Sequence, residues 1–163
     1  IYADLLRGLL VETLVRAAER SRRTGAPRRA ADSFTAAADL IADAEPLRAA
    51  RLLVEAASSG SIAWEQSLTA DTAERAGKLA ASVGDTRLEA SAKALAGRAL
   101  RRIGRHTEAR ELLTQAVAVL RTDPGPDTID ALDALALLEI FAGTSQAAPV
   151  LAEVFDLANT IGV

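Results

Sequence analysis

Arginines are the residues whose type and spacing could do chemistry in this sequence. They gather in two runs, which are Arg20, Arg22, Arg23, Arg28 and Arg29, and Arg98, Arg101, Arg102, Arg105 and Arg110. A guanidinium presents a planar fork of donors that fits a carboxylate or a phosphate. The spacing of Arg98, Arg101 and Arg102 puts them on one broad helix face, where like charges repel unless something acidic lies opposite. The acidic group could be Asp130 or Asp133 of this chain, or else a carboxylate, phosphate or acidic segment from outside it. The pattern therefore predicts a site for an anion or an acidic partner.

Groups that could carry out catalysis are sparse. His106 is the only histidine, and the spacing of the nearby carboxylates suggests neither a metal site nor an acid–base pair. There is no cysteine and no G-x-S-x-G motif, so neither a thiolate nor a serine nucleophile is expected. We expect a protein that is not an enzyme and that has no cofactor and no metal, with His106 in a turn or at a helix start.

The composition predicts a single all-α domain. Half of the 163 residues are hydrophobic but only 3% are aromatic, and alanine and leucine dominate, which favours close-packed helices. The net charge is −3, so no overall field attracts nucleic acid or an anionic membrane. No uncharged stretch approaches the roughly 18 residues of a membrane span. We expect a cytoplasmic protein without direct DNA contact through this chain. The absence of methionine, even at position 1, predicts that the chain is a piece of a longer protein.

Turn signals divide the chain into helical hairpins. Four turns are predicted at "RRTGAPRR", "WEQSLT", "RIGRHT" and "FAGTSQ", centred on Gly25, Ser67, Gly104 and Gly143. Helix breaks fall between them at Glu45-Pro46, at Gly84-Asp85 and at "DPGP" from Asp123 to Pro126. Proline at a first helical position and glycine after a last turn are common boundaries. The signals predict helices at roughly 2–23, 27–44, 46–66, 69–83, 86–103, 107–121, 127–142 and 145–161. These eight helices form an α-solenoid of four antiparallel hairpins, at approximately 1–44, 45–84, 85–123 and 124–163 of one domain.

The end of the third helix is open to two interpretations. The stretch "ASSGS" could be a loop over residues 58–61, or the helix could continue to a turn near Ser67. A stripe with spacing of three and four residues continues through the region: Leu47, Ala50, Val54, Ala57, Ser61, Trp64 and Leu68. One continuous stripe favours one helix and the turn near Ser67.

The hairpin "LAGRALRRIGRHTEARELLTQAVAVL" resembles a tetratricopeptide repeat (TPR). The small and large positions typical of that repeat are occupied by Gly97, Leu100, Ala109, Leu113 and Ala116. Matching residues in the other hairpins are Ala30, Phe34 and Ala37, then Gly60 and Ala76, then Ala136, Ala148 and Ala152. Small residues let paired helices approach closely, and large ones fill the space beside them.

The long, alanine-rich hairpins, as in "LAASVGDTRLEASAKALAGRALRRIGRHTEA", are also similar to the helical-repeat region of large ATP-binding LuxR-type transcriptional regulators. The maltose-regulon activator belongs to that group. The resemblance implies a repeat region that receives effectors or partner proteins, between an ATPase module and a helix-turn-helix module. No G-x-x-x-x-G-K-[ST] motif occurs in this chain, so ATP binding is not implied for it.

In tetratricopeptide arrays the first helix of each hairpin lines the concave face, and the resemblance implies which side chains lie there. They are Arg22, Arg23, Ser61, Trp64, Glu65, Arg98, Arg101, Arg102, Asp130 and Asp133. Trp64 could be a core filler or a groove anchor. We expect a protein or peptide partner, or a small anionic effector, to bind between Trp64 and the arginines of the third hairpin. A homodimer is also possible.

The sequence thus predicts a non-catalytic protein-interaction or effector-sensing module of a bacterial transcriptional regulator. A generic tetratricopeptide scaffold from a signalling protein is the alternative. An RNA-binding helical repeat is a further one, which the arginines favour and the net charge of −3 disfavours.

Overall fold

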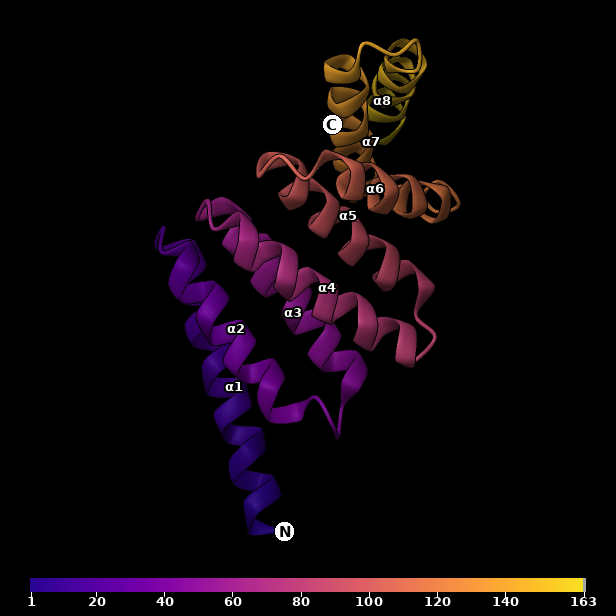
Figure 1. Ribbon diagram of the computed structural model, residues 1–163. Coiled ribbons are helices and arrows are strands. Elements are labelled where there is room, and N and C mark those ends of the chain that lie inside the picture. The colour runs from indigo at the N-terminus through magenta and orange to yellow at the C-terminus, as the bar shows by residue number, and fades with distance from the viewer. Residues whose placement is uncertain (163) are drawn as a thin grey trace.

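Eight helices and no strand make up residues 1–162, the part of the chain that the computed structural model describes (Figure 1). The helices are α1 (Tyr2–Arg23), α2 (Pro27–Ile41), α3 (Pro46–Ile62), α4 (Gln66–Ser82), α5 (Thr86–Arg102), α6 (His106–Leu120), α7 (Pro126–Ala142) and α8 (Ala147–Ile161). They pair in chain order as four antiparallel hairpins, and we call the first helix of each hairpin helix A and the second helix B. The predicted all-α solenoid of four hairpins is confirmed.

Most helix boundaries follow from local chemistry. Pro27, Pro46 and Pro126 each occupy a first helical position, where the missing N–H is not needed and the fixed φ suits a helix. Gly84 and Gly104 follow the ends of α4 and α5 with φ of 76° and 84°, a conformation that side chains with a Cβ disfavour.

The structure corrects the turn of the second hairpin. Residues 58–61 are helical, so a loop there is wrong, but α3 ends at Ile62 and α4 already begins at Gln66. The expected turn at Ser67 therefore lies within α4. The physical reason is that Trp64 adopts a φ of 64°, and a residue in the left-handed region ends a helix in the way that glycine usually does.

The core is built from the small and large residues of the repeat pattern. Gly97 and Leu100 on α5 are buried, and Ala109, Leu113 and Ala116 on α6 are fully buried against them. Ala30, Phe34 and Ala37 play the same part in α2. The predicted tetratricopeptide register is therefore correct for these helices.

The fourth hairpin departs from the expected register. Ala148 and Ala152 are exposed, whereas Val150, Val154 and Leu157 pack on the core. The cause is that α8 packs mainly on α7, so only one face of the helix is covered, and Ala148 and Ala152 lie outside that face.

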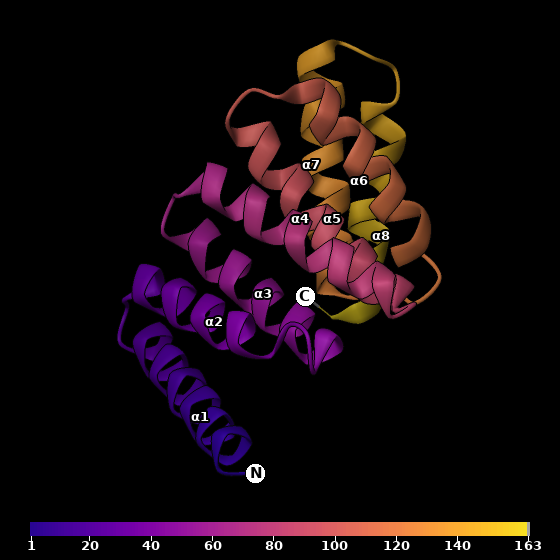
Figure 2. The same cartoon turned by 60° about the horizontal axis from the view of Figure 1, so that its bottom comes forward.

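The hairpins stack in chain order, and the helix axes turn progressively from α1 to α8 (Figures 1 and 2). The turns from helix A to helix B follow one edge of the stack, which we call the A-to-B edge. The turns from helix B to the next helix A follow the opposite edge. None of the described helices is long and apolar enough to cross a lipid bilayer.

Ion pairs connect the A helices of the first and second hairpins, and those of the third and fourth. Arg48 and Arg22 pair with Glu12 and Glu55 between α1 and α3. Arg98 on α5 reaches Asp130 on α7 at 2.8 Å. Each of these pairs is partly exposed, so it holds the spacing of the hairpins more than it stabilises the core.

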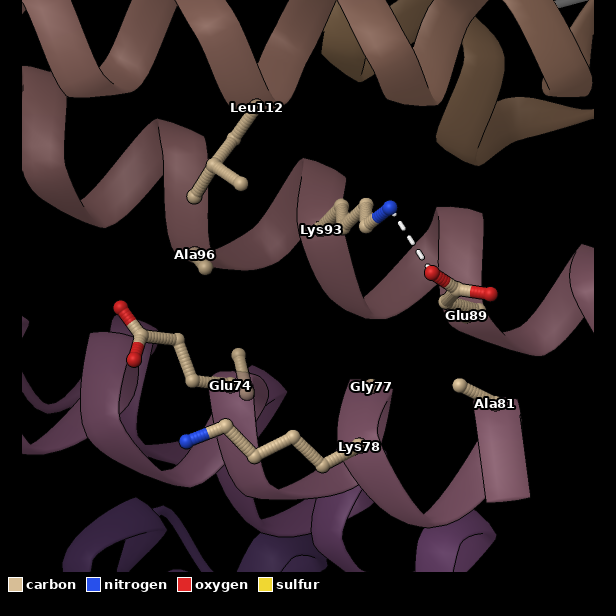
Figure 3. Close-up of a pocket in the computed structure, with 9 residues that line it drawn as sticks. Glu74, Gly77, Lys78, Ala81, Glu89, Lys93, Ala96 and Leu112 are labelled. Carbon is tan, nitrogen blue, oxygen red and sulfur yellow. Dashed lines mark ion pairs between the residues drawn. The ribbon is translucent and has the colours of Figure 1, made fainter.

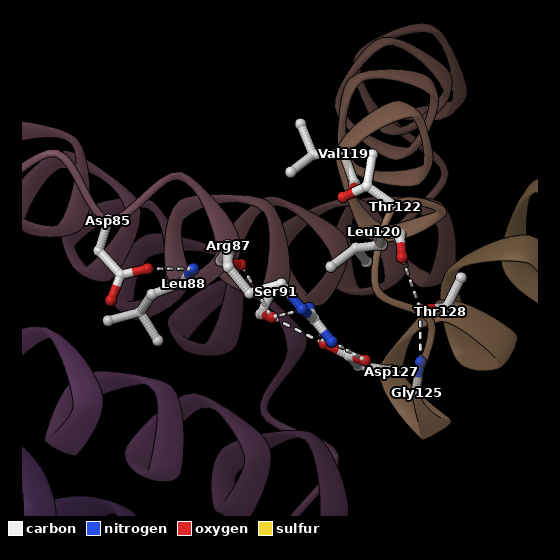
Figure 4. A network of polar contacts seen from close by, with 10 residues as sticks. All are labelled: Asp85, Arg87, Leu88, Ser91, Val119, Leu120, Thr122, Gly125, Asp127 and Thr128. Carbon is white, nitrogen blue, oxygen red and sulfur yellow. Dashed lines mark hydrogen bonds and ion pairs between the residues drawn. The ribbon is translucent and has the colours of Figure 1, made fainter.

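A polar network joins the third and fourth hairpins at the opposite edge (Figure 4). Arg87 on α5 donates to both carboxylate oxygens of Asp127 on α7, at 2.7 and 2.9 Å, and the Ser91 hydroxyl donates to the same carboxylate at 2.7 Å. Burial alone would raise the pKa of Asp127, but the hydrogen bonds from Arg87 and Ser91 outweigh it and hold that pKa below its usual value.

This network predicts an acid-sensitive contribution to stability. The lowered pKa means that the Asp127 carboxylate stabilises the fold above its unfolded-state pKa of about 3.9, and that this contribution is lost as the pH falls through the folded-state value. We expect Asp127→Asn to lower the free energy of unfolding by about 1 kcal/mol at pH 7, a small value because the ion pair is partly exposed. Near pH 3 the same substitution should lower it much less. Urea unfolding at both pH values measures this. The exposed pair of Asp39 and Arg75 provides the control, since Asp39→Asn should change little at either pH.

Candidate functional site

The A-to-B edge carries a regular series of left-handed residues. Gly25, Trp64, Gly104 and Gly143 all have positive φ, and they follow one another at intervals of 39, 40 and 39 residues. Trp64 is the only non-glycine residue with positive φ among residues 1–162. The second hairpin thus places a large aromatic side chain at the position where the other three have none.

Trp64 is the centre of an exposed apolar surface. Its side chain is 79% exposed, and Leu68 and Ile103 beside it are 47% and 40% exposed. With Glu65, Gln66 and Ser67 these three residues line an open pocket of about 420 Å³. We call Trp64, Leu68 and Ile103 the Trp64 patch. Of the two roles expected for Trp64, core filler is therefore wrong.

Neighbouring polar residues hold the patch in place. The Arg102 guanidinium lies over the Trp64 ring, 5.7 Å from its centroid, and donates to the Ser61 hydroxyl at 3.0 Å. Glu65 pairs with Arg28 from α2 at 2.7 Å. Three of the expected site residues, Ser61, Trp64 and Glu65, are thus brought together with Arg102.

The three arginines of α5 do not form one cluster, because each has different surroundings. Arg98 pairs with Asp130, the internal partner expected from the sequence, and Arg102 turns toward Trp64. Arg101 lines a separate pocket with residues of α6 and α7. Asp133 acts on Arg101 only through its field, since no ion pair joins them. Helical spacing alone does not fix which neighbour each side chain meets.

The arginines at the end of α1 lie apart from the Trp64 patch. Arg22 pairs with Glu55 and its guanidinium lies 5.5 Å from the centroid of the Phe34 ring. Arg23 is exposed at the last turn of α1. The predicted binding of a ligand across all of these residues stays a prediction.

A second pocket was not expected from the sequence. It has a volume of about 290 Å³ between α4, α5 and α6, with a floor of small residues and Leu112 (Figure 3). Both lysines of the chain, Lys78 and Lys93, lie at its rim, where Lys93 pairs with Glu89 at 2.8 Å. The spacing of these residues along the sequence gave no signal of a pocket. Across residues 1–162 there is no group of three or more His, Asp or Glu that could hold a metal ion.

Comparisons with known proteins show the fold. No protein-family model and no curated protein matches the sequence. The structure of the apo form of RapI superposes with a TM-score of 0.84 at 11% identity, over 94% of this chain and 57% of the RapI chain. A putative kinesin light chain of Podosopora anserina with nearly identical TPR-like repeats gives a TM-score of 0.70 at 18% identity, over 92% of this chain and 75% of that one. A variant of the same protein gives 0.72.

At these identities the likeness shows the fold alone, that of the TPR-like helical repeats. This chain spans little more than half of the RapI chain, with 57% covered. The features of this chain that bear on a function are the Trp64 patch and the distribution of its arginines.

Proposed function

We propose that this chain is a protein-interaction module whose partner docks on the Trp64 patch at the A-to-B edge. The observation that carries the proposal is the conformation of Trp64. A non-glycine residue in the left-handed region costs about 1–3 kcal/mol, and three equivalent turns avoid that cost with glycine. Because the Trp64 side chain is 79% exposed, it gives little packing in return within the fold.

The chemistry of the patch indicates the kind of partner. Tryptophan and arginine are the residue types that most often dominate binding energy at protein interfaces. Arg102 lies over the indole, and Leu68 and Ile103 flank it with apolar surface. A protein or peptide segment with a protruding apolar side chain fits this surface, since burial of that side chain would drive association.

The resemblance to LuxR-type regulators supports a finer proposal, in which this module receives partners or effectors for a cytoplasmic transcriptional regulator. The repeat interval of 39 or 40 residues agrees with the long hairpins on which that resemblance rests. The sequence of the full-length gene product tests it. A P-loop ATPase before this segment and a helix-turn-helix module after it are expected, and their absence would leave a generic scaffold.

Substitution of Trp64 separates binding from folding. We expect Trp64→Gly to leave the free energy of unfolding unchanged or to raise it by up to about 1 kcal/mol, because the backbone strain is relieved. Peptides selected from a random library on the unaltered chain should bind the variant roughly tenfold or more weakly, because the anchor is missing. Thermal unfolding and the fluorescence anisotropy of labelled peptides measure the two effects.

The control is Phe155→Ala, which removes a side chain that is 67% exposed on α8, outside the patch. It should leave peptide binding unchanged. In the unaltered chain, docking should also shift the emission of Trp64, which is the sole tryptophan. Peptides that bind both variants as well as the unaltered chain would refute the patch as the docking surface. Steep salt-dependent binding of generic RNA with no peptide binding would favour an RNA-binding repeat instead.

A further inference from the structure

Another pocket lies on the same edge, between the third and fourth hairpins. It has a volume of about 380 Å³ and is lined by Arg101, His106, Arg110, Leu138, Phe141 and Ala142. All of its polar lining side chains are cationic or can become so, and the remaining three are apolar. Binding pockets for small ligands begin at about this size.

The polar side of the pocket has more donors than acceptors. The Nε of Arg110 donates to Glu139 at 2.7 Å, and the other carboxylate oxygen of Glu139 accepts from Thr144. This carboxylate is therefore already occupied. The Nε of Arg101 is buried and has no hydrogen-bond partner within residues 1–162.

The charges around Arg101 leave it without full compensation. Burial, and then repulsion from Arg102 and Arg98, lower the pKa of the Arg101 guanidinium, and the field of Asp133 offsets this only in part. Arg98 has its own partner in Asp130. The lining thus carries two guanidinium groups, and Glu139 neutralises one of them. One further negative charge, supplied by a ligand, would neutralise the other.

The rest of the lining is apolar and favours an apolar group. Phe141 is 73% exposed, and Leu138 and Ala142 lie beside it. We propose that this pocket binds a carboxylate attached to a short apolar or aromatic group. The carboxylate meets Arg101, whose planar fork of donors fits it, and the apolar group lies against Phe141. A single net positive charge suits a monovalent carboxylate better than a phosphate dianion.

Such a carboxylate has two sources, a free organic acid and the C-terminus of a polypeptide that ends in an apolar residue. The experiment uses 3-phenylpropanoate for the first and N-acetylglycylphenylalanine for the second, in isothermal titration with the full chain. The matching neutral amides and inorganic phosphate are the reference probes. At least one of the two acids should bind about fivefold or more tightly than its amide and than phosphate. If both acids bind, a free organic acid is a sufficient ligand. If only the peptide binds, the ligand is the C-terminus of a polypeptide.

Two variants locate the bound acid. Arg101→Gln should weaken binding about fivefold or more, whereas Arg98→Gln, three residues earlier on the same helix but outside the pocket, should leave it within about twofold. Phe141→Ser should weaken the binding of the aromatic acid. Because Phe141 is largely exposed, this variant is expected to fold even if Arg101→Gln does not. Equal binding of acids and amides, or binding insensitive to Phe141→Ser, would overturn the proposal. Neither result depends on whether peptides dock on the Trp64 patch.

Discussion

Gly97→Ala is expected to destabilise this protein although alanine is the best helix former. A Cβ at position 97 would lie 2.7 Å from Cγ of Leu113 and 3.2 Å from the carbonyl oxygen of Ala109. Leu113 is fully buried and cannot move aside. Overpacking of this kind costs about 1–3 kcal/mol, and Gly97→Leu should prevent the third hairpin from closing.

The matched control is Gly77→Ala, in a helix of the same length. A Cβ there would lie 3.7 Å from Cβ of Ala92, which is an ordinary contact. This change should raise the free energy of unfolding by up to about 1 kcal/mol, through higher helix propensity. Chemical unfolding of both variants gives the comparison. If Gly97→Ala proved as stable as Gly77→Ala, the close contact of α5 and α6 and the tetratricopeptide register would both be wrong.

Removal of the fourth hairpin is expected to disrupt the third. One core cluster includes Leu113, Val117 and Leu120 of α6 together with Leu132 and Leu138 of α7. Ending the chain at residue 125 would remove the α7 side chains of this cluster, and each large apolar side chain is worth about 1.5–3 kcal/mol when buried. Because repeat hairpins are stable only through their neighbours, we expect loss of cooperative unfolding, or aggregation.

A shorter truncation is the control for this prediction. Ending the chain at residue 145 removes α8, none of whose described residues is fully buried, and keeps α7 in place. It should be much milder than removal of both helices. Calorimetry with light scattering distinguishes the two truncated chains. Unchanged melting after removal of both helices would show that the fourth hairpin is not part of the array.

Helix positions could be predicted where proline or glycine mark the boundaries. Pro27, Pro46 and Pro126 gave three helix starts, and Gly84 and Gly104 gave two turns. The turn at Trp64 was misplaced because residues 62–66 contain neither proline nor glycine. The stripe of apolar residues continues across this turn, so the periodicity did not indicate that a helix ends there. The repeat interval could have located the turn, since the 39 residues between Gly104 and Gly143, counted from Gly25, lead to Trp64.

The candidate site was harder to predict than the fold. The pairing of Arg98 with Asp130 followed from their places in neighbouring hairpins. The separation of Arg101 from Arg102 did not, since helical spacing describes one helix and not the surfaces packed against it. Arg102 turns toward α3 and the second turn, and Arg101 toward α6 and α7. These directions depend on the angle between hairpins, which the sequence does not state.

The ion pairs between neighbouring A helices also give the array a mechanical property. They act at positions where one hairpin could tilt against the next, and their partners are partly exposed, as at Arg22 with Glu55 and Arg98 with Asp130. Salt screens such pairs, but it leaves the apolar contacts within and between the hairpins intact. We therefore expect neighbouring hairpins to tilt against each other slightly more easily at high ionic strength. The distance between the first and last turns should then vary a little with salt.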